Sequence, residues 1–165
     1  MNIEKFKIVD YESRYAKDID DMEINQWGEW GEESIDDFVN DNEIIRVALY
    51  DNDFVGVAYG NLEKNFFWID VICILPKYQK QGFGTIMLDD IINVAKSKFH
   101  IKLVRTESVY INGRSNSKKM LEYRGFKTYK KQEKGYWGKM WPNVFCTECN
   151  HCPCECITLF YELKL

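Results

Sequence analysis

The chain has 165 residues, of which 45% are hydrophobic, 29% charged and 15% aromatic, which suits the core of one domain and leaves no room for a second sizeable one. The net charge of −4 gives no reason to expect a nucleic-acid or anionic-membrane partner. The most apolar run, 66–75, contains Asp70 and is far shorter than the roughly 20 residues of a membrane helix, and the first residues lack the apolar centre of a signal peptide. We therefore expect a single cytoplasmic domain spanning residues 1–165.

The first half of the chain is predicted to contain strands and two short helices. The spacing predicts a strand at 6–9, helices at 11–25 and 32–39 around an aromatic turn at 26–31, and strands at 44–50, 54–60 and 65–75. Asp51-Asn52-Asp53 separates two of these strands in the way that a hairpin turn does.

The second half begins with a long helix, predicted from 82 to 100. Its expected apolar stripe consists of Ile86, Leu88, Ile91, Ile92, Val94 and Ala95. The remaining pattern predicts a strand at 102–110, a helix at 115–124 stopped by Gly125, a strand at 126–129, a cysteine-rich insert at about 134–156 and a closing strand at 157–165.

The most specific catalytic signal is the segment 74–85, ILPKYQKQGFGT, which runs from a strand directly into a helix. Gly82 and Gly84 let the backbone approach a ligand, and the first turn of the helix presents unpaired N–H groups at the positive end of its dipole. A pyrophosphate would fit there, and an ordinary tight turn is the alternative. The segment is not a P-loop, because no Gly-Lys-Ser/Thr follows, and it lacks the glycine spacing of a Rossmann turn.

Gln79-x-x-Gly82-x-Gly84 after an Ile-x-Pro strand end resembles the acetyl-CoA motif of the GNAT N-acetyltransferase superfamily. The segment 117–126, SKKMLEYRGF, is similar to a later helix of that family, which ends in Gly-Phe. The resemblance covers about residues 4–130 and 157–165. It implies an α+β (α/β three-layer) fold with a central mixed, mostly antiparallel sheet of about seven strands flanked by about four helices.

The resemblance also implies the transfer of acetyl from acetyl-CoA to an amine. The turn would hold the pyrophosphate through the backbone of Gln79, Lys80, Gln81, Gly82, Phe83, Gly84 and Thr85. The strand residues Ile72, Cys73 and Ile74 would pair with pantetheine, and the Ile74 amide would stabilise the oxyanion. Fifteen Lys or Arg against five acidic residues in the segment 77–139 suit the phosphates of coenzyme A.

A general base and a general acid assist such a transfer. Family members often place a Glu early on the central strand and a Tyr four residues before the Gly of Gly-Phe, where this chain has Trp68 and Leu121. Asp70 shares a face with Trp68 by strand alternation and is our candidate base, with an Asp satisfied by neighbouring groups as the alternative. Tyr123 is the candidate acid, although helix geometry turns it about 200° from the usual position, and Tyr110 is a second candidate.

The resemblance places the acceptor pocket at the first helices and at the hairpin before the last strand. The first region is the segment 18–43, which has eleven acidic residues, no Lys or Arg, and both Trp27 and Trp30. The second contains Tyr136, Trp137 and Trp141. Carboxylates beside aromatic faces suit a cationic amine. The alternative is that the acidic residues are the solvated faces of two amphipathic helices.

Five of the six cysteines fall within eleven residues, namely Cys146, Cys149, Cys152, Cys154 and Cys156. In a reducing compartment such crowding indicates metal or redox chemistry. Structural zinc takes four ligands, and we expect Cys146, Cys149 and two of the other three to bind it. Cys146, Cys149, Cys152 and Cys156 also match the spacing of a four-iron cluster, and thiols without a metal are the third alternative. The sixth cysteine, Cys73, is expected in the core.

We therefore expect an N-acetyltransferase that uses acetyl-CoA, acts on a primary amine of a small molecule or peptide, and is a monomer or homodimer. The alternative is a catalytically silent acetyl-CoA-binding module whose cysteine cluster senses metal or oxidants, because the usual Glu and Tyr are missing. A zinc-dependent nucleic-acid binder has little support, since the net charge is negative and no base-reading motif is present.

Overall fold

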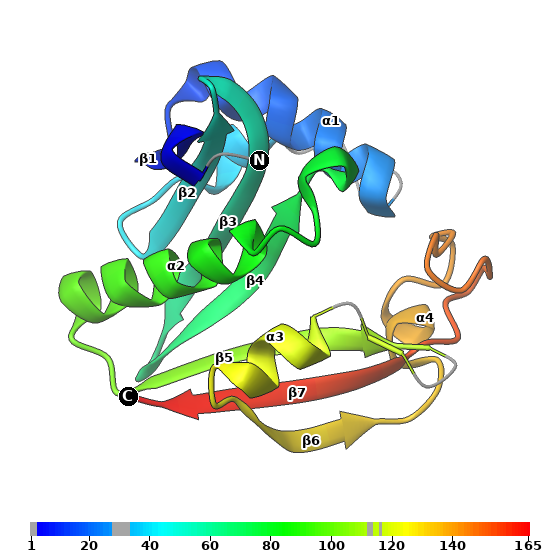
Figure 1. Cartoon of the computed structure of the whole chain (residues 1–165). Coiled ribbons are helices and arrows are strands. Elements are labelled where there is room, and N and C mark those ends of the chain that lie inside the picture. Colours follow the sequence, from blue (N-terminus) through cyan, green and yellow to red (C-terminus); the bar gives the residue numbers. More distant parts are fainter. Residues whose placement is uncertain (1–2, 28–33, 112–113, 116) are drawn as a thin grey trace. The chain divides into compact units, whose positions relative to one another are not determined.

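The computed structural model describes residues 3–27, 34–111, 114–115 and 117–165. These residues form seven strands in the order β1-β2-β3-β4-β5-β7-β6 and four α-helices, which confirms the predicted α+β fold class (Figure 1). In chain order the elements are β1 (Phe6–Asp10), α1 (Ala16–Trp27), β2 (Glu43–Tyr50), β3 (Asp53–Glu63), β4 (Phe66–Ile74), α2 (Phe83–Phe99), β5 (Leu103–Tyr110), α3 (Lys118–Tyr123), β6 (Lys127–Gln132), α4 (Tyr136–Met140) and β7 (Ile157–Lys164).

The chain divides into two compact units. Unit 1 consists of Met1–Asp20, Glu33–Val104 and Leu165, and unit 2 consists of Asp21–Glu32 and Arg105–Lys164. The boundaries fall inside α1 and near the start of β5. The single domain expected over residues 1–165 stays a prediction.

Unit 1 is built on the antiparallel strands β1 to β4. β2 and β3 join through a two-residue turn at Asp51 and Asn52, whose φ angles of 57° and 73° are the left-handed values of a type I′ hairpin. Asp and Asn adopt these values more readily than other residues with a side chain. The predicted hairpin is therefore confirmed.

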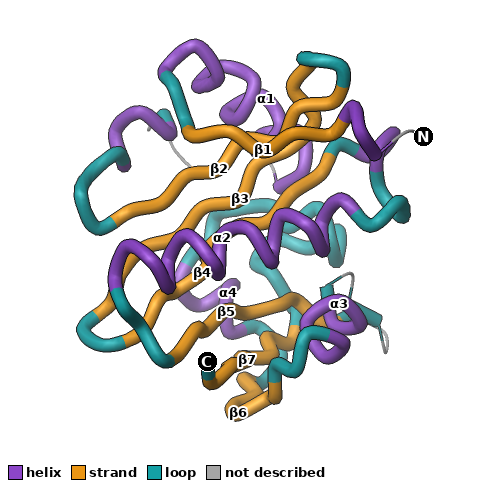
Figure 2. The backbone as a smooth tube through the Cα atoms, turned by 60° about the vertical axis from the view of Figure 1, so that its left-hand side comes forward, coloured by secondary structure: helices purple, strands orange, loops and turns teal. Residues whose placement is uncertain are grey.

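Helix α2 packs on β2, β3 and β4 within unit 1 (Figure 2). Its buried residues are Phe83, Met87, Leu88, Ile91, Ile92 and Ala95. The prediction was wrong for Ile86 and Val94, which are only half-buried. Met87 continues an i, i+4 series along the buried face, whereas Ile86 and Val94 lie at its margin.

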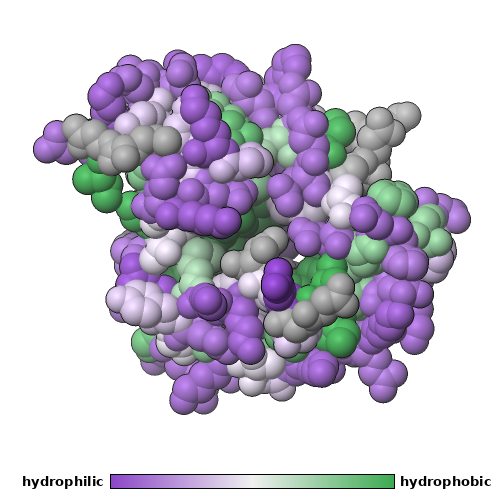
Figure 3. All heavy atoms as spheres, turned by 45° about the vertical axis from the view of Figure 1, so that its right-hand side comes forward, coloured by the Kyte–Doolittle hydropathy of each residue, from purple (hydrophilic) through white to green (hydrophobic). Residues whose placement is uncertain are grey.

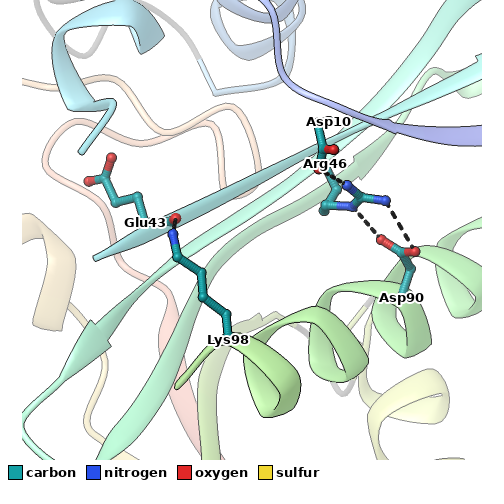
Figure 4. A network of polar contacts seen from close by, with 5 residues as sticks. All are labelled: Asp10, Glu43, Arg46, Asp90 and Lys98. Carbon is teal, nitrogen blue, oxygen red and sulfur yellow. Dashed lines mark hydrogen bonds and ion pairs between the residues drawn. The ribbon is translucent and has the colours of Figure 1, made fainter. Parts of the chain in front are cut away.

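Ionic contacts fix α2 against the sheet of unit 1 (Figure 4). The guanidinium of Arg46 on β2 contacts Asp10 on β1 and donates through Nε to Asp90 on α2 at 2.6 Å. Lys98 on α2 donates through Nζ to the backbone carbonyl of Glu43 at 3.0 Å. The side chains of Arg46 and Asp90 are only 12% and 26% exposed, so this ion pair is better shielded from solvent than an ordinary surface pair, whereas the Asp10 side chain is 91% exposed. The helix therefore has a defined position on the strands.

In unit 2 the strand order is β5-β7-β6, with β6 and β7 antiparallel. Figure 1 shows α3 lying across β5 and β7. The core includes Leu121 of α3 and Leu159, Phe160 and Tyr161 of β7. Gly125 ends α3 with a φ of 87°, as the sequence predicts.

Some observed elements differ from the predicted ones, and the helix predicted at 11–25 begins only at Ala16, after a 3₁₀ turn over Ser13–Tyr15. The described part of the helix predicted at 32–39 is a single 3₁₀ turn over Ile35–Phe38, begun by Ser34, whose side chain forms a capping box with Asp37, and residues 32–33 lie outside the described residues. Helix α3 begins at Lys118 instead of 115, because the Ser115 hydroxyl accepts the Lys118 N–H. The insert contains a helix, α4, that was not predicted.

Hydrophilic side chains cover most of the face shown in Figure 3, and hydrophobic ones gather in smaller areas. No helix in the described part of the chain combines the length and apolarity that a membrane crossing requires.

Candidate active site

The candidate coenzyme turn connects the end of β4 with α2. Pro76–Tyr78 forms a 3₁₀ turn, Lys80 has a φ of 60°, and Gly82 has a φ of 89° as the N-cap of α2. The Gln79 side chain closes the turn, because its Nε2 donates to the Ile74 carbonyl at 2.8 Å. A Cβ at Gly82 would have no atom within 4 Å, so the space above this residue is open.

Five consecutive backbone amides of this turn, from Lys80 to Gly84, donate to no protein acceptor in the described residues. The flanking amides are paired, since Gln79 N donates to Pro76 O at 3.3 Å and Thr85 N to Gly82 O at 3.0 Å. Successive free N–H groups at the start of a 17-residue helix suit an anion, because the helix dipole adds to their partial charges. Of the residues 79–85 predicted to bind pyrophosphate, those from 80 to 84 have backbone amides that are available to an anion.

Half-buried and buried aromatic rings of unit 1 pack against one another beside the turn. The Phe83 ring lies parallel to the Phe6 ring at a centroid distance of 4.2 Å. Tyr50 lies 5.6 Å from Tyr78 and 6.0 Å from Phe83, again between ring centroids. Phe83 is thus a core residue that offers only its backbone to a ligand, and the rings hold that backbone in place.

The other part of the candidate coenzyme site is the side of β4 that faces away from β3. Leu75 N donates to Val55 O at 2.8 Å, and Gly56 pairs with Ile74 in the antiparallel register. Because antiparallel residues alternate in direction, the amides of Ile72 and Ile74 face away from β3, whereas the Cys73 amide faces β3. Cys73 is also buried, as expected. Of the three predicted pantetheine partners, Ile72 and Ile74 have amides that face away from β3.

Asp70 is the extra residue of a β-bulge. Tyr59 pairs with Val71 and Gly60 with Ile69, so Asp70 has no partner on β3. A Cβ at Gly60 would lie 2.1 Å from the Trp68 carbonyl oxygen, so only glycine allows the strands this approach. The choice of Asp70 assumed that side chains alternate regularly between the two faces of β4. The bulge interrupts this alternation between Asp70 and the residues Ile72 and Ile74.

The Asp70 carboxyl has a raised pKa although solvent reaches it. Enough protein surrounds it that lost hydration raises the pKa of Asp70 to about 7, and the negative charges of Glu43 and Glu63 add to the effect. A hydrogen bond from Trp68 opposes the shift. Asn61 Nδ2 also donates to Asp70 Oδ2 at 3.3 Å. A carboxyl with this pKa exchanges protons readily near neutral pH.

Glu43 is a neighbour of Asp70 that the sequence did not single out. Figure 4 shows its carboxylate pointing away from Lys98, which bonds the backbone carbonyl of Glu43 instead. Burial raises the pKa of Glu43 against the lowering effect of contacts with Asn40, and its Oε2 has no hydrogen-bond partner within the described part of the chain. Glu43 pairs with Asn61 across β2 and β3, and Asn61 pairs with Trp68 on β4, so the register alone would have brought these residues together.

The candidate acids lie in unit 2. Tyr123 is the last residue of α3 and is 80% exposed, with the Arg124 guanidinium 5.4 Å from its ring centroid. Tyr110 is the last residue of β5, and Lys118 Nζ lies 5.9 Å from its ring centroid.

Several acidic residues of the segment 18–43 have structural partners. Asp20 accepts from the Ser34 hydroxyl at 2.6 Å and from the Ile35 N–H at 3.0 Å. Asp36 accepts from Tyr11 at 2.5 Å, and Asp37 belongs to the capping box. These carboxylates stabilise the chain instead of facing a ligand. Trp30, predicted on the acceptor side, lies outside the described residues, and Tyr136 packs on Phe160 with ring centroids 6.0 Å apart.

Four cysteines of the insert form one cluster, which we call the thiol cluster: Cys146, Cys149, Cys154 and Cys156. Their Sγ atoms all lie within 4.8 Å of one another, and those of Cys146 and Cys156 are 3.7 Å apart. Cys152 lies outside it, exposed, with its Sγ 3.6 Å from the Pro142 carbonyl oxygen. The structure thus brings together four of the five predicted ligands. This set includes Cys154 and omits Cys152, whereas the iron–sulfur spacing requires Cys152 and omits Cys154.

The turn between β4 and α2, with backbone amides that have no acceptor among the described residues, suits the phosphate groups of a coenzyme. The family model described as "Acetyltransferase (GNAT) family" matches residues 9–126. The chain therefore belongs to the GNAT acetyltransferase family. No curated protein matches it by sequence.

Solved structures of this family share the fold. A GNAT family acetyltransferase from Elizabethkingia anophelis with acetyl-CoA bound is 18% identical, with a TM-score of 0.72 over 98% of this chain and 99% of that one. The ribosomal-protein-S18-alanine N-acetyltransferase from Escherichia coli is 14% identical, with a TM-score of 0.73 over 96% and 93%. A Bacillus subtilis acetyltransferase in complex with CoA is 15% identical, with a TM-score of 0.71 over 98% of both chains.

Proposed function

We propose that this acetyltransferase moves the acetyl group of acetyl-CoA to a primary amine by direct attack. The observation that supports this most strongly is the run of five backbone amides from Lys80 to Gly84 that have no acceptor among the described residues, a few residues after the Ile72 and Ile74 amides that face away from β3. A pyrophosphate on the turn and an extended pantetheine arm along Ile72 and Ile74 would use both features. The solved structures from E. anophelis and B. subtilis hold acetyl-CoA and CoA.

In the proposed reaction the amine nitrogen attacks the thioester carbonyl carbon. The Ile74 amide donates to the developing oxyanion, which then collapses as the C–S bond breaks and coenzyme A leaves. Asp70 takes the proton of the attacking amine, directly or through a water molecule. The thiolate takes a proton from the candidate acid Tyr123 or from water.

We propose a cationic acceptor, small molecule or peptide. The carboxyls of Glu43 and Glu63 lie close enough to Asp70 that their charge adds to the rise of its pKa, which lost hydration causes first. Such a concentration of negative charge attracts an ammonium group and then accepts its proton. The proposed attraction comes from the carboxyls on the strands. Several acidic residues of the segment 18–43 instead accept hydrogen bonds within the protein, as Asp20 and Asp37 do.

The test is release of the coenzyme A thiol from acetyl-CoA in the presence of amines. We expect release with a cationic primary amine, slower release with a neutral primary amine of equal size, and none with the matching tertiary amine. Binding of acetyl-CoA without release for any amine would support the silent module instead. A preference for the neutral amine would contradict the role proposed for the carboxyls.

The thiol cluster lies outside the proposed transfer reaction, and we propose that it holds a structural zinc ion. The cytoplasmic location and the monomeric or homodimeric state stay predictions from the sequence.

A further inference from the structure

The thiol cluster has the dimensions of a tetrahedral metal site. A tetrahedron of sulfur atoms around zinc, with Zn–S of about 2.3 Å, has edges of about 3.8 Å. The 3.7 Å between Cys146 and Cys156 is one such edge, and the remaining separations within 4.8 Å need only small rotations of the side chains. Four thiolates and no open position are typical of a structural zinc site.

The backbone around the cluster is arranged to present sulfur atoms to one point. Cys146 N donates to His151 O at 3.0 Å, which folds 146–151 into a tight turn, and Asn150 takes a φ of 54° just after Cys149. The Glu155 N–H lies 3.4 Å from Cys149 Sγ, and the Cys156 N–H lies 3.4 Å from Cys154 Sγ. Such N–H donors stabilise the negative charge of metal-bound thiolates.

Helix α4 packs tightly against this loop. A Cβ at Gly138 would lie 2.3 Å from the Cys154 carbonyl oxygen, so α4 and the loop approach each other at a position that only glycine allows. Gly135 N donates to Cys156 O at 3.1 Å, and Lys134 pairs with Glu155 at 2.5 Å. The cluster is therefore part of a packed structure instead of a loose loop.

The same turn contacts helix α1 within unit 2. The hydroxyl of Thr147, which lies between Cys146 and Cys149, donates to the Gln26 carbonyl in the last turn of α1 at 2.7 Å. Carbonyls of a last helical turn have no partner inside the helix, so this hydroxyl completes the end of α1. Thr147 directly follows Cys146 and lies two residues before Cys149, in the segment that these two thiols would attach to a metal.

We infer that zinc bound by Cys146, Cys149, Cys154 and Cys156, and not by Cys152, holds the turn 146–151 in place and thereby secures the C-terminal end of α1 through Thr147. Each thiol that binds releases its proton to solvent, and the ion stays four-coordinate. This inference rests on the proposed zinc ion and is independent of the acetyl transfer.

The metal is tested first, on the full chain purified without oxygen. We expect one zinc per chain, and cobalt substitution should give the absorption of a tetrahedral thiolate complex. Cys149→Ser should abolish the stoichiometric metal, whereas Cys152→Ser should leave it unchanged. Absence of stoichiometric metal in the wild type, or equal loss in both variants, would overturn the proposed ligand set.

Alkylation supplies a test that does not depend on folding of Cys149→Ser. In the zinc-loaded wild type, iodoacetamide should modify Cys152 and leave the four cluster thiols unmodified, and a chelator should expose those four. Modification of cluster thiols at the same rate before and after chelation would contradict zinc binding.

The link to α1 is tested by amide hydrogen exchange. Thr147→Val should keep the zinc and raise exchange in residues 23–27, and chelation of the wild type should do the same, with α2 unchanged in both. Unchanged exchange at the end of α1 in the variant would disprove the link while leaving the zinc site intact. Because neither readout uses acetyl-CoA, failure here is separate from failure of the proposed enzymatic reaction.

Discussion

At the scale of single residues, Asp70 combines an unusual backbone position with an unusual pKa. The bulge removes it from the pairing of β3 and β4. Reduced hydration and the charges of Glu43 and Glu63 raise its pKa to about 7. Both properties suit a group that accepts a proton during turnover at neutral pH.

Replacing Asp70 with Asn should remove one limb of the pH–rate profile. For the wild type, kcat/KM should rise with pH through about 7, because only the ionised carboxylate accepts a proton. The variant should lose that limb and be slower by a factor of about 10² or more. Steady-state kinetics from pH 5 to 9 with one primary amine check this, and turnover that is unchanged across pH would rule out Asp70 as the base.

The same substitution should change how stability depends on pH. The folded-state pKa of Asp70 is raised from 3.8 to about 7, so its contribution to stability is complete below the lower value and is lost as the pH rises through the upper one. The urea midpoint of the wild type should therefore fall, relative to that of Asp70→Asn, as the pH rises from about 4 to about 8. Parallel midpoints over this range would show that the pKa is not raised.

At the scale of elements, the connection from β4 to α2 places free amides at a helix start, and the bulge places Asp70 earlier on the same strand. Both depend on glycine, since Gly82 has a left-handed conformation and Gly60 faces the Trp68 backbone. Substitutions at the two glycines should therefore separate coenzyme binding from proton transfer.

Gly82→Ala should weaken acetyl-CoA binding by about tenfold, because a side chain in the left-handed region costs about 1–2 kcal/mol and fills the open space above the turn. Gly125→Ala is the matched control: its φ of 87° is nearly the same, and it lies at the end of α3. Titration calorimetry should show the loss of affinity for Gly82→Ala alone. Equal losses in both variants would indicate a general effect on folding.

Gly60→Ala should impair proton transfer and leave the binding of acetyl-CoA nearly unchanged. Its Cβ would lie 2.1 Å from the Trp68 carbonyl oxygen, so the bulge must shift, at a cost of about 1–3 kcal/mol in the free energy of unfolding. We expect a lower kcat and a displaced pH limb with little change in acetyl-CoA affinity. Retention of the wild-type pH profile despite measurable destabilisation would mean that the bulge does not position the base.

Local sequence signals predicted these elements unevenly. The turn residues Gln79, Gly82 and Gly84 predicted the coenzyme turn, because their conformational requirements are local. The bulge was missed, since alternation assumes a regular strand, although Gly60 inside a strand pattern was a signal. Glu43 and Glu63 join Asp70 only through cross-strand register, which residue spacing does not reveal.

At the scale of the whole molecule, two compact units contribute different features. Unit 1 contains the candidate coenzyme turn, the strand β4 and the carboxyls around Asp70. Unit 2 contains Tyr123 and the thiol cluster. The family resemblance predicted the order of elements and the seven strands. It did not extend over the insert, where the choice among five cysteines depended on how the loop folds on α4.

The central claim is that the acetyl group ends on the amine nitrogen. The most direct measurement incubates the chain with acetyl-CoA labelled with ¹³C in the acetyl group and a cationic primary amine, and follows the label by NMR together with free thiol. We expect the label in an amide of the acceptor, with one thiol released per amide formed. Thiol release without labelled amide, or bound acetyl-CoA that keeps its label with every primary amine, would contradict the proposed transfer.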